Sequence, residues 1–269
     1  MPNPNPALLG STMPFSMRHA RGIFGGTDPK KIAMLVKSLI ADYGHVEEEC
    51  IGTLDTVKWT TAVSAGGGPT AFAYSAVRGG VFQGRTGATD NDACAITAAQ
   101  TFLDPADNPF FIISFSVGAV TGLQLEIGMS DPKTDEALPG VTDVDTPTVG
   151  NGVTDIVCVH LDTDQTLTTM ELVGDGTTGS AALSSGPTLT AAAYTPSVAD
   201  TYITVVIGAR PNLGYASIFD GTGYRGTFSV ANGPDSGVLI RPYALFRTRN
   251  TTSKTVNIRW MLYGWERNG

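Results

Sequence analysis

Residues 122–129, GLQLEIGM, alternate strictly between large apolar side chains and side chains that are polar or absent. One phase holds only apolar residues: Leu123, Leu125, Ile127 and Met129. The other phase holds Gln124 and Glu126 between two glycines. A period of two is typical of a β-strand that turns one face toward a core and the other face away from it. This stretch therefore predicts a strand, and its pattern recurs along the chain.

The same period extends over most of the sequence after Cys50. It predicts further strands in these ranges: 56–63, 71–77, 80–85, 91–98, 108–117, 155–162, 168–173, 201–210, 215–221, 226–230, 238–250 and 255–265. In the last range, one phase is expected to face the core: Val256, Ile258, Trp260 and Leu262. In 238–250, the phase expected to face away from the core consists of Arg241, Tyr243, Arg247 and Arg249.

Many strands with turn residues between them, and no second helix to cover a sheet, require two sheets that cover each other. The predicted fold is therefore all-β, an antiparallel jelly-roll β-sandwich over residues 51–269. The acidic, turn-rich stretch 130–154 is predicted to be a long surface loop. The stretch 174–200 is predicted to be a loop with one weak strand inside it.

Residues 28–50 are predicted to form one amphipathic helix and a connector. Asp28 can cap the helix, Pro29 suits its first turn, and Gly44 can end it. Its apolar residues recur at three- and four-residue spacing along one stripe: Ile32, Leu35, Val36, Leu39, Ile40 and Tyr43. Two interpretations of this stripe stay open. It packs on the protein's own sheet, or it contacts another subunit.

Residues 1–27 are predicted to form an extended N-terminal arm, because they combine several prolines with scattered apolar residues and no periodicity. Such an arm can dock its apolar side chains on a partner, and a frayed terminus is the alternative interpretation. The partner-binding residues predicted from the arm and the stripe are Leu8, Leu9, Phe15, Ile23, Ile32, Leu35 and Leu39.

The net charge of −8 argues against a nucleic-acid partner, because an acidic surface repels phosphate. No segment reaches the roughly 18 apolar residues that a membrane-spanning helix needs, so no membrane contact is expected. The N-terminal sequence lacks the basic start and apolar stretch of a secretory signal, which favours folding in a cytoplasm. The isolated cysteines Cys50, Cys94 and Cys158 indicate neither a disulfide framework nor a zinc site.

The sequence predicts a protein that is not an enzyme. There is no GxSxG motif, and His160 shares a strand face with Ile156 and Cys158, where a buried or interface imidazole is the expected state. Sandwich glycosidases place two carboxylates on one strand face. Here Glu126 and Asp131 lie five residues apart, and a continuing strand would send them to opposite faces.

Two candidate binding sites remain. Asp162 and Asp164 supply the hard oxygen ligands that calcium prefers, although no EF-hand pattern surrounds them and a solvated acidic turn is the alternative. Apart from this calcium, no cofactor is expected. Tyr263 and Trp265 fall in the phase opposite the predicted core and are candidates for glycan contact. Trp59, like Trp260, is expected in the core.

The order of these elements resembles that of concanavalin-like, or lectin-like, jelly-roll structural proteins of tailed phages. The resemblance covers residues 55–265. It is carried by Trp59 near the start and by FFIISFSV (110–117), LQLEIGMSD (123–131), DIVCVHLDTD (155–164), DTYITVVIGAR (200–210), YASIFDG (215–221) and LIRPYALFRTRN (239–250) before a long closing strand. The paired metal and sugar loops of legume lectins are not recognisable, and the arm and helix lie outside the resemblance.

The resemblance implies a structural virion protein that folds in the host cytoplasm. Its expected role is a capsid decoration or other particle-accessory protein, which contacts other virion proteins such as a major capsid protein. A homo-oligomer is expected, a trimer by analogy with many decoration proteins. The alternative is a carbohydrate-binding, lectin-like module that recognises a receptor.

Overall fold

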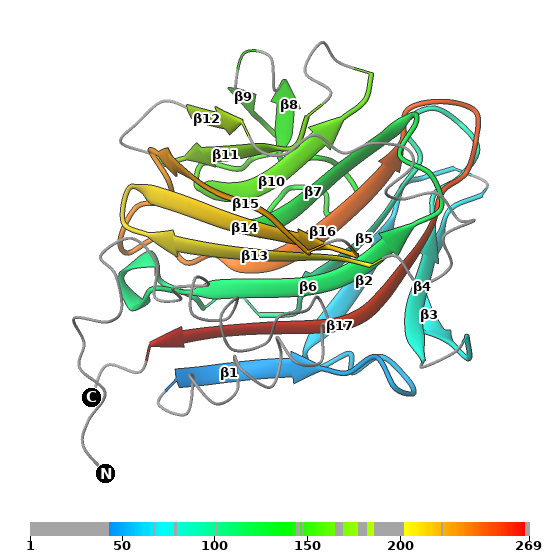
Figure 1. The fold of residues 1–269 in the computed structure, drawn as a ribbon, viewed down its shortest axis with the longest axis horizontal. Coiled ribbons are helices and arrows are strands. Elements are labelled where there is room, and N and C mark those ends of the chain that lie inside the picture. The colour runs from blue at the N-terminus through cyan, green and yellow to red at the C-terminus, as the bar shows by residue number, and fades with distance from the viewer. Residues whose placement is uncertain are drawn as a thin grey trace.

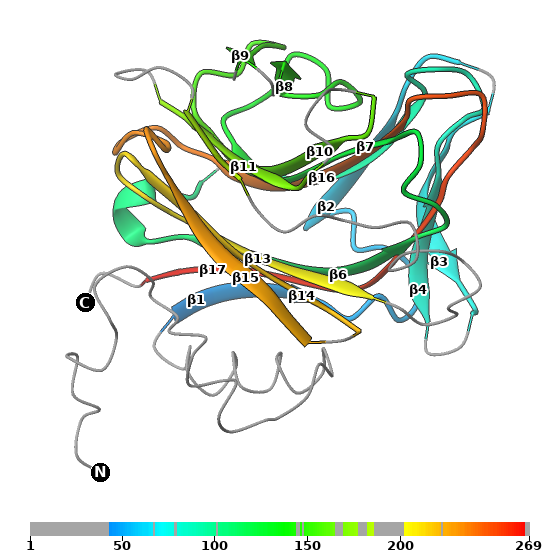
Figure 2. The same cartoon turned by 45° about the horizontal axis from the view of Figure 1, so that its top comes forward.

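Two antiparallel β-sheets packed face to face form the main part of the described structure (Figures 1 and 2). The predicted all-β sandwich is confirmed. The computed structural model describes residues 43–66, 68–77, 80–100, 102–143, 146, 148–164, 169–176, 182–185, 202–221 and 223–266. The predicted arm, residues 1–27, and the predicted helix as far as residue 42 lie outside these ranges.

Within the described residues, sheet A has eight strands and sheet B has seven. In spatial order sheet A contains β15 (Gly223–Ala231), β14 (Leu213–Asp220), β13 (Ile203–Arg210), β6 (Phe110–Val117), β17 (Thr255–Glu266), β4 (Val81–Arg85) and β3 (Thr70–Ser75), while β1 (Tyr43–Glu48) also pairs with β17. Sheet B contains β12 (Ala182–Ser185), β11 (Glu171–Asp175), β10 (Ile156–Asp162), β7 (Leu123–Ser130), β16 (Arg241–Thr248), β5 (Ala93–Ala98) and β2 (Trp59–Val63). A separate hairpin pairs β8 (Val141–Asp143) with β9 (Thr148–Val149), and a 3-10 turn, η2, covers Pro105–Asp107.

The hydrophobic core lies between the inner faces of the two sheets. The apolar phase of residues 122–129 is part of it, as predicted. Its largest members are aromatic: Trp59, Phe82, Phe111, Phe115 and Phe246. Trp59 meets the ring of Tyr263 edge-on, with ring centroids 5.5 Å apart. Burying each of these side chains stabilises the fold by roughly 1.5–3 kcal/mol relative to leaving it in water.

A β-bulge in β17 reverses the phase of the closing strand. The pairing of β17 with β6 shifts register between Ile258 and Trp260, and an extra residue at a bulge sends the following side chains to the opposite face. Before the bulge, Ile258 faces the core as predicted. After it, the residues that face the core are Met261 and Tyr263. The predicted phase is therefore wrong beyond Ile258, and Trp260 is buried on the outer face of sheet A instead of in the core.

The N-terminal boundary of the sandwich also differs from the prediction. Residues up to 50 were expected to form a helix and a connector, but Tyr43–Glu48 form β1, antiparallel to β17. Gly44, predicted to end the helix, lies opposite Trp265. A Cβ atom on Gly44 would come within 2.4 Å of the Trp265 ring, so glycine permits close pairing of the two strands. Sheet A thus includes residues before 51.

The stretch 130–154 is not a simple surface loop. It contains the β8–β9 hairpin, which Figure 2 shows on the side of sheet B that faces away from sheet A. Val141 is completely buried and belongs to a second apolar cluster with Ile156 and Tyr243. The turn residues in this stretch therefore connect segments that pack over the outer face of sheet B, and we call this stretch the cover. In the part of the chain that the structure describes, no helix is long and apolar enough to cross a membrane.

Candidate functional site

The outer face of sheet B, turned away from sheet A, carries polar and charged side chains that are nevertheless buried. The register aligns two rows across the strands: Glu171, His160 and Glu126 in the first, and Asp162, Gln124 and Arg247 in the second. All of these except Arg247 are at most 2% exposed. We call these six residues, together with Tyr243 and Arg249 of the same face, the buried polar face. Such a face requires internal partners, because burying an unpaired charge is costly.

Glu126 is held by donors from the hairpin segment and from β16. The backbone N–H of Gly140 donates to Oε2 at 2.8 Å, and that of Val141 donates to Oε1 at 2.9 Å. The Tyr243 hydroxyl also donates to Oε2, at 3.1 Å. Burial raises the pKa of the Glu126 carboxyl, while the nearby charge of Lys133 lowers it. This carboxyl group therefore fastens the cover formed by residues 130–154 to sheet B.

Lys133 supplies a positive charge from the cover itself. Its Nζ donates to the carbonyl oxygen of Leu138 at 3.2 Å and lies 4.0 Å from the centroid of the Tyr243 ring. Such a position over an aromatic face is favourable for an ammonium group. Burial lowers the pKa of Lys133, whereas the charge of Glu126 raises it. Glu126, Lys133 and Tyr243 thus form one buried cluster between the cover and the sheet.

His160 is neutral in this setting. Arg247 Nη1 donates to Oε1 of Gln124 at 3.1 Å, which leaves the Gln124 Nε2 group to donate to Nε2 of His160 at 3.2 Å. An accepting Nε2 places the ring proton on Nδ1. Burial, followed by the charge of Arg249, lowers the pKa of His160 to about 3. Although Nε2 also lies 3.9 Å from Oε1 of Glu126, a neutral ring forms no ion pair there.

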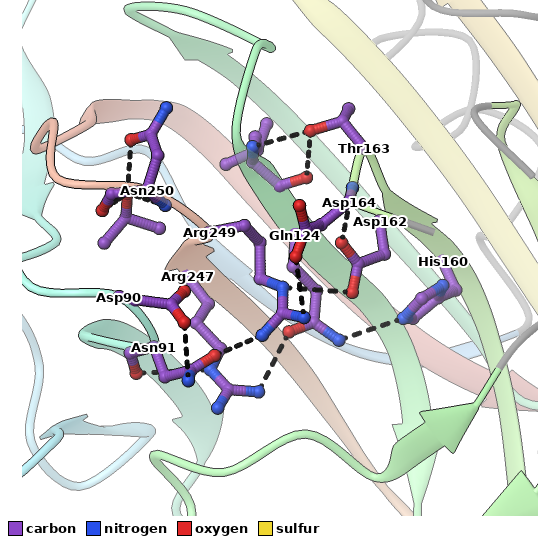
Figure 3. A network of polar contacts seen from close by, with 12 residues as sticks. Asp90, Asn91, Gln124, His160, Asp162, Thr163, Asp164, Arg247, Arg249 and Asn250 are labelled. Carbon is purple, nitrogen blue, oxygen red and sulfur yellow. Dashed lines mark hydrogen bonds and ion pairs between the residues drawn. The ribbon is translucent and has the colours of Figure 1, made fainter. Parts of the chain in front are cut away.

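Arg249 joins the turn after β10 to the turn before β5 (Figure 3). Its Nε lies 3.3 Å from Oδ2 of Asp162, and its Nη2 lies 3.3 Å from Oδ2 of Asp164. Its Nη1 donates to Oδ1 of Asn91. Asp162 Oδ1 also accepts the backbone N–H of Asp164 at 3.0 Å. The guanidinium group of Arg249 therefore contacts both carboxylates, Asp162 and Asp164, that the sequence predicts as calcium ligands.

The calcium hypothesis for Asp162 and Asp164 does not fit this geometry. Calcium requires several oxygen ligands that converge on one point. Here the positive charge of Arg249 already lies against both carboxylates and would repel a second cation. Among the residues that the structure describes, no group of three or more His, Cys, Asp and Glu side chains is arranged to hold a metal ion.

A carboxylate pair on the buried polar face deserves comparison with a glycosidase site. Glu126 and Glu171 flank His160 from the two neighbouring strands, so their separation follows from two strand spacings of about 4.8 Å each. Glycosidases need such carboxylates open to the sugar. Both glutamates are 0% exposed. In this arrangement they offer a substrate no surface, and their described contacts are structural.

The predicted glycan platform is altered by the bulge in β17. Tyr263 is 2% exposed and packs in the core, where burial raises its pKa to about 12. Trp265 is half-buried, with its ring edge-on to Phe102 at a centroid distance of 4.9 Å. Tyr263 therefore cannot form the exposed aromatic surface that the sequence suggested.

The predicted partner-binding residues lie outside the described residues: Leu8, Leu9, Phe15, Ile23, Ile32, Leu35 and Leu39. Sequence reasoning also missed the roles of Lys133 and Tyr243 beside Glu126. One signal was present, because Arg247 and Arg249 lie in the outward phase of a long apolar strand. Charged residues in that position require partners on the neighbouring strands.

Three exposed apolar residues have atoms close to Gly80. A methyl group on Gly80 would lie 3.4 Å from Cε2 of Tyr74 and 3.8 Å from Cα of Ile51, and the Gly80 N–H donates to the carbonyl oxygen of Val77 at 2.8 Å. Ile51, Tyr74 and Val77 are 68%, 45% and 44% exposed. We call these three residues the edge patch, because Tyr74 belongs to β3, the last strand on this side of sheet A. Residues 59–77 contain no charged side chain.

Comparison with known proteins identifies the fold. No family model and no curated protein matches the chain. Among solved structures, peanut lectin with a bound 9mer peptide aligns with a TM-score of 0.54 and 10% identity, over 83% of this chain and 98% of that lectin. The fold is a lectin-like jelly roll. At so low an identity the likeness shows the fold alone.

Two further structures support the same fold. A lectin from Bauhinia forficata in complex with GalNAc aligns with a TM-score of 0.51 and 11% identity, over 84% of this chain and 100% of that one. A protein of unknown function from Shewanella oneidensis MR-1 aligns with a TM-score of 0.51 and 10% identity, over 89% of this chain and 95% of that one. The lectin-like jelly roll is thus shared with two lectins and with a protein of unknown function.

Proposed function

We propose that the chain is a non-enzymatic structural protein that acts through protein–protein contacts, as a capsid decoration or other accessory subunit of a phage-like particle. The observation that carries the proposal is the edge patch. Its three exposed apolar side chains adjoin a run without charge in a protein of net charge −8. Contiguous exposed apolar surface is typical of protein contact sites. The assignment to a phage-like particle rests on the sequence resemblance to jelly-roll structural proteins of tailed phages.

The buried polar face supports the non-enzymatic part of the proposal. Its carboxylates and imidazole are 0–1% exposed at Glu126, His160 and Asp162, and they are engaged by donors of the same chain. An active site needs groups that can reach a substrate. In this proposal the ionisable residues of the buried polar face fasten sheet B to its cover, and the edge patch is the surface that contacts partners.

The proposal is tested by expressing the chain together with the structural genes that adjoin it in its own genome and sedimenting the particles. The wild-type chain should sediment with them. Ile51→Asp should remain at the top of the gradient, because a charge in the edge patch must be desolvated on contact. Leu239→Asp is the matched control, since Leu239 is also exposed, at 48%, but lies away from the patch in sequence.

Each outcome decides a separate part of the proposal. If Ile51→Asp sediments as the wild type does, the edge patch is not the contact surface. If the wild-type chain sediments with no particle and its gene lies among metabolic genes, the role in a particle is wrong. Light scattering of the purified chain tests the expected homo-oligomer, and a strict monomer at micromolar concentration excludes a preformed trimer.

A carbohydrate-binding module is the second candidate, and the likeness of fold to lectins favours it. Because Tyr263 is buried, the candidates for this role among the described residues are the exposed aromatic side chains Tyr74 and Tyr224, 45% and 40% exposed. A glycan array, read with and without a chelator, provides the test. Signal that disappears in Tyr74→Ala or Tyr224→Ala supports sugar binding at an aromatic surface. Flat binding across a broad array excludes it.

A further inference from the structure

The strand β2, at one edge of sheet B, lacks the features that keep other strands from adding to a sheet edge. Charged residues, proline, bulges and short length have this effect. Among the described edge strands of the two sheets, β1 contains Glu47 and Glu48, β15 contains Arg225, β3 pairs irregularly with β4 near Thr70, and β12 has only four residues. β2 (Trp59–Val63) has no charge and no proline, and it pairs with β5 in unbroken register. Its edge can therefore accept a further strand.

The register of β2 shows which of its backbone groups face outward. In an antiparallel pair, alternate residues direct both N–H and C=O toward the partner strand. The N–H of Ser64, just after β2, donates to the carbonyl oxygen of Ala93 at 3.2 Å. Even-numbered residues thus face β5, and the N–H and C=O groups of Thr61 and Val63 face away from it. Within the described residues, no strand pairs with this side of β2.

The surroundings of this edge favour an uncharged partner. Residues 59–77 contain no charged side chain, although the net charge of the protein is −8. The charge just before β2, on Lys58, already lies 3.1 Å from Oδ2 of Asp55. Val63 is 39% exposed and Thr60 is exposed as well. Two copies of the chain can meet at this edge without bringing like charges together, which is costly at other contacts.

We propose that β2 binds the β2 strand of a second copy, antiparallel, about a twofold axis at Ala62. Thr61 of each copy then lies opposite Val63 of the second copy, and each such pair exchanges both of its N–H···O bonds. Both residues are β-branched, which suits them to cross-strand pairing. At the axis, Ala62 faces its own counterpart, and two methyl groups fit where the strands approach most closely.

The contact uses the same strand of both copies, so it closes as a dimer and joins the two B sheets into one. It gives the expected homo-oligomer a twofold contact in place of the trimer expected by analogy. The inference rests on the free edge of β2 and is independent of the role in a particle. It is therefore tested on the purified full chain.

A pair of cysteine variants locates the axis. Directly opposite residues of a non-hydrogen-bonded antiparallel pair have Cα atoms about 4.5 Å apart, which a disulfide can bridge. Ala62→Cys should therefore form a covalent dimer under mild oxidation, seen by non-reducing electrophoresis. Thr60→Cys is the matched control on the same face of β2, because it would lie about 13 Å along the strand from its counterpart. The native cysteines Cys50, Cys94 and Cys158 are buried.

A pair of variants at Thr61 tests the hydrogen bonds. Thr61→Pro removes an N–H that faces away from β5, so it takes no hydrogen bond from the β2–β5 pair. Thr61→Val keeps the N–H. In sedimentation velocity at micromolar concentrations, the wild type and Thr61→Val should dimerise equally, and Thr61→Pro should dimerise several-fold more weakly.

The cysteine pair decides the question if Thr61→Pro does not fold. Cross-linking several-fold faster in Ala62→Cys than in Thr60→Cys supports the proposed axis. Equal cross-linking of the two variants overturns the proposal. Dimerisation of folded Thr61→Pro as strong as that of the wild type, or a wild-type chain that stays monomeric throughout the micromolar range, overturns it as well.

Discussion

The two outer faces of the sandwich differ more than its two inner faces do. Both inner faces are apolar and contribute to one core. The outer face of sheet A presents Phe110, Ile112 and Leu262, whereas the outer face of sheet B presents Glu126 and His160. Both sets are fully or almost fully buried. One buried outer face is therefore apolar, whereas the other is polar and requires hydrogen-bond donors and a countercharge.

This difference distinguishes the inner faces, which specify the fold, from the outer faces, which are particular to this protein. Alternating apolar strands suffice to pair two sheets, which is why lectins at 10% identity share the architecture. The outer faces instead match particular covering segments. On sheet B, the cover formed by residues 130–154 brings the N–H groups of Gly140 and Val141 to one carboxyl group. Substitutions on the two outer faces should therefore destabilise the protein for different physical reasons.

The largest effect is expected from Glu126→Ala. It leaves the N–H groups of Gly140 and Val141 and the hydroxyl of Tyr243 without their acceptor, and it removes the countercharge of Lys133. Breaking one side of such a buried cluster should lower the free energy of unfolding by about 3–5 kcal/mol, measured by urea denaturation. Glu126→Gln keeps an acceptor oxygen and should lose less. A loss below about 1 kcal/mol in Glu126→Ala, the net value of one hydrogen bond, would contradict the role of Glu126 in fastening the cover to sheet B.

On the outer face of sheet A, Leu262→Ala is expected to lower the free energy of unfolding by about 2–4 kcal/mol, because this side chain is 0% exposed and its truncation leaves a cavity. Leu239→Ala is the matched control, since that side chain is 48% exposed and should cost no more than about 0.5 kcal/mol. Thermal and urea denaturation of both variants provide the measurement. Equal losses in the two variants would mean that the outer face of sheet A is open to water at Leu262.

The third prediction concerns pH and His160. The pKa of this group falls from its ordinary 6.5 to about 3 on folding, so the unfolded chain takes up a proton in this window while the folded chain does not. Stability from this group is present above about pH 6.5 and is lost as the pH falls toward 3, by up to about 1.4 kcal/mol per pH unit.

His160→Gln removes the titrating ring and keeps an oxygen that can accept from Gln124. Urea denaturation at several pH values should give a shallower loss of stability between pH 6.5 and 3 in this variant than in the wild type. Glu126 acts with the opposite sign, because burial raises its pKa and its contribution falls as the pH rises. Since Glu126 is present in both proteins, the difference between the two curves isolates His160. Parallel curves would show that the buried ring does not resist protonation.

The smallest effect is expected from Asp164→Ala. This carboxylate contacts Arg249 at 3.3 Å but its side chain is 59% exposed, so the pair is screened by water. The variant should lose less than about 1 kcal/mol in urea denaturation. Asp162→Ala provides the comparison, because the side chain of Asp162 is only 2% exposed and shares the same guanidinium. A larger loss of unfolding free energy in Asp164→Ala than in Asp162→Ala would show that Asp164, and not Asp162, is the main partner of Arg249.

The sequence predicted the sandwich well because the inner faces follow a local rule. Residues 122–129 place their apolar phase in the core, and each predicted strand range after Cys50 overlaps an observed strand. Period-two alternation reports burial on one side of a strand, and it does so without knowledge of the partner strand. The strand β12, within the stretch 174–200, was also expected.

The errors arose where the structure depends on contacts between distant segments. The bulge after Ile258 leaves no mark in the alternation, because β17 is apolar in both phases there, and it moved Tyr263 from the surface to the core. The sequence of the short strand β1 is interpreted as the end of a helix and its connector until its pairing with β17 is known. The partners of Glu126 are backbone N–H groups, which no side-chain pattern can reveal.

The position of β17 in sheet A has a consequence for the order of folding. β17 pairs with β6 on one side and with β4 and β1 on the other, so it is the piece that joins the two halves of the sheet. On a growing chain, β1, β3 and β4 emerge early and have no link to β6 until β17 follows. Contacts between segments so far apart in sequence form slowly, and unpaired strand edges meanwhile favour aggregation. Until β17 is synthesised, β1 and β4 therefore lack the strand with which they pair in sheet A.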